Sequence, residues 1–134
     1  MGQITKKEHR AAKARTIAFR KFFKNIKAPN VINLNTWYYE ETFGDIDECG
    51  SVGCLGGYAE NSPMVKRFCD KTCRDKYETD SLFAFFGVSR REANELSLFE
   101  SSQSPKFGSI PNGHKYEALE RLDSVIRLHN EALA

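Results

Sequence analysis

Residues 79–92 read Thr-Asp-Ser-Leu-Phe-Ala-Phe-Phe-Gly-Val-Ser-Arg-Arg-Glu, and this stretch holds the end of one helix and the start of the next. The apolar run Leu82 to Phe86 predicts a short helix with Thr79 or Asp80 as its N-cap, because their side chains accept hydrogen bonds from free backbone N–H groups. Gly87 is expected to end this helix in the left-handed conformation, which glycine adopts without steric cost.

The next helix is expected to begin at once. Val88 supplies the apolar contact that commonly follows a left-handed helix end. Ser89-Arg-Arg-Glu92 has the pattern of a capping box. In this motif the serine side chain accepts a hydrogen bond from the backbone N–H of the glutamate, and the glutamate side chain accepts one from the backbone N–H of the serine. The helix that starts there should direct three apolar residues inward: Ala93, Leu96 and Phe99.

The aromatic residues Phe83, Phe85 and Phe86 cannot all face one core from a single helix. This helix is therefore either buried on more than one side or part of an exposed apolar patch. An exposed patch would mark a contact site for a partner or for a second copy of the chain.

Helix signals extend in both directions. Ser62-Pro63 combines an N-cap with a proline at the first helical position, so a helix should run from there to about Lys76. After a loop over residues 101–114, a last helix is expected at 114–132. Its apolar stripe contains Leu119, Leu122, Val125, Ile126 and Leu133.

The first helix is expected over residues 5–27, and it is strongly basic. Residues 1–27 carry nine Lys or Arg against Glu8 alone, while the whole chain has a net charge of +2. At 100° per residue one side collects Ala11, Ala18, Phe19, Phe22 and Ile26, and the opposite side collects Lys6, Arg10, Lys13, Arg20, Lys24 and Lys27. Arg15 on the apolar side and Ile17 on the basic side are exceptions.

These elements predict one fold class. A chain of 134 residues with 40% hydrophobic residues suits a single domain with a core of its own. We expect a mainly α, single-domain bundle of five or six short helices over residues 1–134, with the Cys/Gly motif core at 31–100. One short extended segment is expected near 31–35, and an acidic glycine-containing loop at 43–53.

Four cysteines, Cys49, Cys54, Cys69 and Cys73, are the candidate metal ligands. Four thiolates could hold zinc tetrahedrally, but the C-x4-C and C-x3-C spacings differ from the usual C-x2-C pairs, so buried thiols without a cofactor are the simpler interpretation. Cys54 near a helix N-terminus is a weak candidate nucleophile, because no histidine stands in a distinctive context beside it.

The stretch Cys49-Gly-Ser-Val-Gly-Cys-Leu-Gly-Gly-Tyr-Ala59 resembles a group of small phage and bacterial proteins. Their pattern is a Trp, then Cys-Gly-Ser/Thr-x-x-Cys-x-x-Gly-x-Ala, then a helix junction and a Leu-Phe pair. The remaining matches are Trp37, Phe86-Gly-Val-Ser89 and Leu98-Phe99, while Tyr58 and Gly56 depart from the usual residues. The resemblance implies a helical fold and a phage or prophage origin, and it supplies no catalytic residue.

Function is expected to lie in binding rather than catalysis. No apolar stretch approaches the roughly 20 residues that span a bilayer, and no secretory signal opens the chain, so a cytoplasmic protein without membrane contact is expected. The leading hypothesis is a small accessory protein that binds a host or phage protein. The alternatives are nucleic-acid binding through the six basic residues of the first helix and a cysteine- or zinc-dependent enzyme centred on Cys54.

Overall fold

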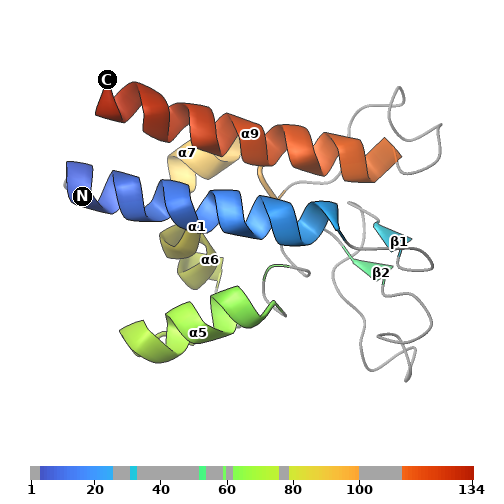
Figure 1. Cartoon of the computed structure of the whole chain (residues 1–134), viewed down its shortest axis with the longest axis horizontal. Helices are drawn as coiled ribbons and strands as arrows, with labels where there is room; N and C mark the ends of the chain where they lie inside the picture. The colour runs from blue at the N-terminus through green and yellow to red at the C-terminus, as the bar shows by residue number, and fades with distance from the viewer. Residues whose placement is uncertain are drawn as a thin grey trace.

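The computed structural model describes residues 4–25, 31–32, 52–53, 59, 62–75, 79–99 and 113–134 (Figure 1). The predicted mainly α fold is confirmed in this part of the chain. Its five helices are α1 (Lys6–Lys24), α5 (Pro63–Thr72), α6 (Thr79–Phe86), α7 (Arg90–Glu95) and α9 (Gly113–Leu133). None of these helices is long and apolar enough to cross a membrane.

Three helices begin at a capping side chain. Thr5 Oγ1 accepts a hydrogen bond from the Glu8 N–H at 3.1 Å, and Ser62 Oγ accepts one from the Val65 N–H at 3.2 Å. The capping box predicted at Ser89 is confirmed in both directions, with N···O distances of 3.0 and 2.9 Å. Thr79 and Asp80 already lie within α6, so neither is the N-cap predicted for this helix.

Left-handed residues end the three short helices. Gly87 has a φ of +67°, and the N–H groups of Gly87 and Val88 donate to the carbonyls of Ala84 and Phe83, as the sequence predicted. Cys73 (φ 57°) and Ser97 (φ 52°) hold the same conformation without being glycine. Because Cys73 turns the chain, α5 ends at Thr72 and does not reach Lys76.

Helices α1 and α9 lie side by side and run in opposite directions, which places both chain ends on one side of the molecule (Figure 1). The helix predicted over 5–27 ends at Lys24, where Asn25 caps it. Its buried face is also rotated from the expected one: Ala18 is exposed, and the buried residues are Ala12, Thr16, Phe19 and Phe23. The Thr16 hydroxyl is satisfied within the helix, donating to the Ala12 carbonyl at 2.8 Å.

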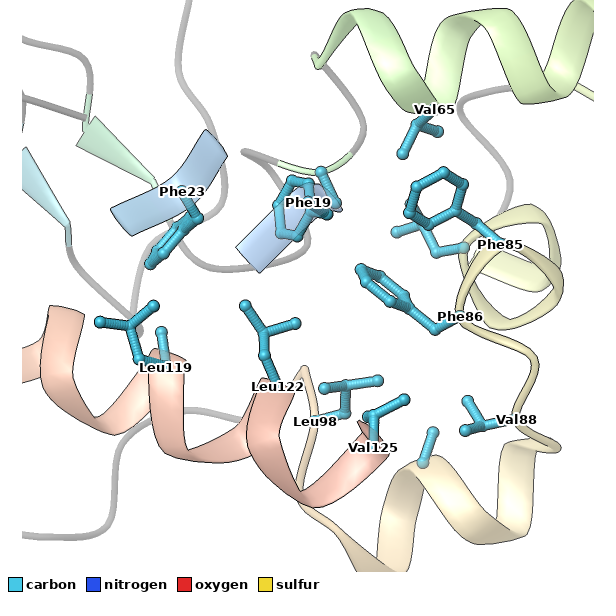
Figure 2. Packing of buried hydrophobic residues seen from close by; sticks show 14 of the residues in the cluster. Phe19, Phe23, Val65, Phe85, Phe86, Val88, Leu98, Leu119, Leu122 and Val125 are labelled. Carbon is cyan, nitrogen blue, oxygen red and sulfur yellow. The ribbon is translucent and has the colours of Figure 1, made fainter. Parts of the chain in front are cut away.

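Helix α6 is buried on more than one side, which resolves the question raised by its aromatic residues. It packs against α1, α5 and α7. Phe85 and Phe86 are 1% and 0% exposed, and their rings project from α6 and meet Phe19 edge-on (Figure 2). Leu98, Leu122 and Val125 close the core from the other side. Phe83 is half-buried, so α6 presents no broad apolar patch.

Strands β1 (Val31–Ile32) and β2 (Val52–Gly53) form a two-residue parallel pair. Val31 is in register with Val52, and Ile32 with Gly53. The extended segment expected near 31–35 therefore includes a strand. Val52–Gly53 was expected within a loop and is also a strand. The sequence did not predict it, because its strand conformation depends on backbone pairing with a segment distant in the chain.

Candidate functional site

One side of α1 is covered by no other described element, and we call it the outer face of α1. It consists of the exposed residues Lys6, Lys7, Arg10, Ala14, Ile17, Ala18, Lys21 and Lys24. None of its five cations forms an ion pair with a residue that the structure describes. The acidic residue of this helix, Glu8, is bound to Arg15 and does not neutralise them.

The predicted basic stripe is only partly the same surface. Lys6, Arg10 and Lys24 are exposed as expected, whereas Lys13 is half-buried and Lys27 lies outside the described residues. The stripe did not include Lys7 and Lys21, which are exposed. Lys7 and Lys21 can be assigned to the outer face of α1 only once the position of α9 against α1 is known.

Arg20 belongs to the α1–α9 contact. Its Nε lies 2.6 Å from Asp123 Oδ1 and its terminal nitrogen 3.2 Å from Asp123 Oδ2, a two-point pairing of guanidinium with carboxylate. Such a pair sets the register between the two helices. Arg20, predicted as a binding residue, is therefore engaged within the fold.

Arg15, the exception on the apolar side of α1, reaches the carboxyl-terminal end of α6. Its Nε donates to the Phe85 carbonyl at 2.7 Å, and a terminal nitrogen donates to the Ala84 carbonyl at 3.1 Å and to Glu8 Oε2 at 2.6 Å. The guanidinium also lies 4.6 Å from the centre of the Phe68 ring. A cation suits this place because the carboxyl-terminal end of a helix is electronegative.

His129 completes this helix end from α9. Its side chain is fully buried, and Nε2 lies 2.8 Å from the Phe86 carbonyl oxygen. Its Nδ1 lies 2.9 Å from Nδ1 of His9 on α1. With Arg15, Gly87 and Val88, His129 gives the last four carbonyls of α6 a partner each, so this end has no free acceptor for a ligand.

The two described cysteines face different surroundings. Cys69 is buried, and burial raises the pKa of its thiol, which disfavours the thiolate that a metal needs. Cys73 is exposed at the turn after α5. In the described part of the chain, no three His, Cys, Asp or Glu side chains are placed to hold a metal ion. The other two candidate ligands, Cys49 and Cys54, lie outside the described residues. Cys54 is also the candidate nucleophile, so that prediction lies outside them as well.

Replacing Cys73 with glycine is expected to stabilise the protein by about 1 kcal/mol, since a left-handed non-glycine residue costs roughly 1–2 kcal/mol. The measurement is the free energy of unfolding in urea. Cys73→Ala is the control, because alanine keeps the left-handed strain and should give no gain. Loss of stability in both variants would instead indicate that the thiol has a partner, as the zinc hypothesis requires.

No protein-family model, no curated protein and no solved structure matches this chain. The resemblance to small phage and bacterial proteins stays a prediction. Of its central motif the structure describes Val52–Gly53 and Ala59, and Ala59 is fully buried. The outer face of α1 is therefore the candidate site that the described residues support best.

Proposed function

We propose that this protein is a binding protein whose outer face of α1 docks on nucleic acid. The observation that carries the proposal is the set of five exposed cations, Lys6, Lys7, Arg10, Lys21 and Lys24, without a carboxylate partner in the described structure. Lysine and arginine side chains on one helix face neutralise backbone phosphates and release their counterions, which is the main source of non-specific affinity.

The shape of the face suits a long, regular polyanion. From Lys6 to Lys24 the helix is about 27 Å long at 1.5 Å per residue, so the two groups of cations stand at the two ends of a straight edge. Ala14 and Ala18 have short side chains, so the phosphate backbone meets the cations at the two ends of the edge without a bulky side chain on the Ala14 and Ala18 flank. The rest of the chain is net acidic and restricts binding to this edge.

We expect micromolar binding of a fluorescently labelled duplex of about 20 base pairs at low salt, measured by anisotropy. The logarithm of the affinity should fall with the logarithm of the salt concentration with a slope of about −3.5 to −4.5, because roughly four to five phosphates are neutralised. The triple variant Arg10→Glu, Lys21→Glu, Lys24→Glu should bind at least about 100-fold more weakly at the same salt.

The matched control makes the same charge change elsewhere. Lys66, Arg67 and Lys71 are exposed on α5, and their reversal to Glu should leave affinity within a few-fold of the unmodified protein. Equal losses in both variants would show that net charge, rather than the outer face of α1, governs binding. Affinity that does not respond to salt would contradict the proposal.

A protein partner is the second candidate, and one observation favours it. Ile17 is 47% exposed and lies between Ala14 and Ala18, so the middle of the outer face is apolar with cations at both ends. An acidic amphipathic helix would fit such a surface. Pull-down of the tagged protein from a phage-host lysate, with and without nuclease, separates the candidates: a stoichiometric protein retained after nuclease and lost with Ile17→Asp supports this one.

A further inference from the structure

His9 and His129 form a hydrogen bond whose proton positions follow from their neighbours. The Phe86 carbonyl oxygen can only accept, so His129 Nε2, at 2.8 Å, carries a proton and donates it. In a neutral imidazole the other nitrogen is then bare, and His129 Nδ1 is an acceptor. His9 Nδ1, 2.9 Å away, must be the donor. The chain of donors therefore runs from α1 through α9 to the end of α6.

A proton on each ring has a different consequence. His9 is half-buried, and a proton added to its Nε2 leaves the Nδ1–H donor in place. A proton added to His129 Nδ1 reverses the direction of the contact, because a neutral His9 must then carry its own proton on Nε2 and accept with Nδ1. When both rings are protonated, the contact has two donors and no acceptor. The two rings meet edge-on with centroids 5.1 Å apart, and His129 is 0% exposed, so water cannot take over the lost bond.

Burial and the neighbouring His9 and Arg15 oppose the protonation of His129. From α1 it faces His9 and Arg15, from α7 it faces Glu92, and from α6 the Phe86 carbonyl. Burial is the largest influence and lowers the pKa of His129, with His9 and Arg15 acting in the same direction and the Phe86 carbonyl and Glu92 against it. The neutral ring is the form that the fold accommodates.

We propose that His9 and His129 form an acid-sensitive latch that holds the first turns of α1 and the last turns of α9 against the end of α6. The latch is closed while at least one of the two rings is neutral. Protonation of both rings opens it, because the contact then has no acceptor and the charge on His129 is repelled by His9 and Arg15. Because Lys6, Lys7 and Arg10 lie in the same turns of α1, opening also changes one end of the outer face.

The sign of the pH effect follows directly. The folded state binds the proton on His129 more weakly than the unfolded chain, so the stabilisation is complete above pH 6.5, the ordinary value for histidine, and is lost as the pH falls below it. The equilibrium constant for unfolding should rise up to about tenfold for each pH unit in this range. The rise continues until His129 is also protonated in the folded protein.

The discriminating variant is His129→Gln. Its amide nitrogen can donate to the Phe86 carbonyl and its amide oxygen can accept from His9, but it does not titrate. We expect His129→Gln to lose this acid dependence of unfolding, measured in urea from pH 7.5 to 5. His9→Gln is the matched control and should keep it, because His129 remains. Identical pH dependence in the unmodified protein and His129→Gln would overturn the proposal.

Two measurements on the unmodified chain test the latch even if a variant does not fold. In ¹⁵N spectra of the rings at pH 7.5, Nδ1 should be protonated in His9 and bare in His129. Amide hydrogen exchange should lose protection at residues 6–12 and 125–133 between pH 7.5 and 5.5, before the rest of the molecule. A protonated Nδ1 on His129, uniform loss of protection, or stoichiometric Zn²⁺ binding that involves both rings would each overturn it.

Discussion

Replacing Gly87 with alanine is expected to destabilise the protein by about 2–5 kcal/mol, although it adds a single methyl group. A Cβ at this position would lie 2.3 Å from the Ala12 Cβ and 3.0 Å from the His129 ring. Overpacking of this kind costs roughly 1–3 kcal/mol, and the left-handed φ of +67° adds roughly 1–2 kcal/mol for any residue other than glycine. Unfolding in urea measures the loss.

A double-mutant cycle with Ala12→Gly separates the two causes. Removing the Ala12 methyl relieves the contact with α1 but leaves the backbone strain and the contact with the His129 ring. In the Ala12→Gly background, Gly87→Ala should therefore cost less than in the unmodified protein, with the backbone strain of about 1–2 kcal/mol as the lower bound because the contact with the His129 ring remains. The same cost in both backgrounds would show that α1 and the end of α6 are not in contact here.

Phe19→Ala is expected to cost about 3–5 kcal/mol, the range for truncating a buried phenylalanine. Phe19 is 0% exposed, and its ring lies 5.5 Å from that of Phe86 and 6.4 Å from that of Phe85, between centroids. The truncation therefore opens a cavity where α1 meets α6. Thermal or urea unfolding should show the loss, with little change in helix content of the folded state.

Phe22→Ala is the matched control, because it makes the same chemical change three residues along the same helix. Phe22 is half-buried at the edge of the core, with its ring 5.9 Å from that of Phe19. We expect a cost of about 1 kcal/mol, since less apolar area leaves water. Equal costs for the two variants would contradict the burial that the structure assigns to α1.

The starts and ends of the helices could be predicted from the sequence because capping is local. Ser62, Ser89 and Gly87 act on backbone groups within five residues of themselves, so neighbouring residues carry the whole signal. Two helix ends could not be predicted from local sequence. Cys73 and Ser97 end helices as glycine would, and neither residue type signals this.

The rotation of α1 could not be predicted in the same way. The apolar pattern placed Ala11 and Ala18 inward, but both are small and contribute little to the pattern. The true buried face passes through Thr16, whose hydroxyl is satisfied by its own helix. The rotation of α1 also determines which of its basic residues remain exposed. Helix α9 lies against one flank of α1, and its Asp123 pairs with Arg20.

Local sequence alone thus defined a mainly α protein, most of its helix boundaries and a basic first helix, because hydrogen bonding and amphipathic spacing act over a few residues. Only the tertiary structure decided which cations form the outer face of α1 and why Arg15 and His129 occupy the core side. Both side chains bind carbonyl oxygens at the end of α6, some 70 and 43 residues away in the chain. Contacts between such distant residues leave no periodic signal in the sequence, since they depend on how whole helices pack.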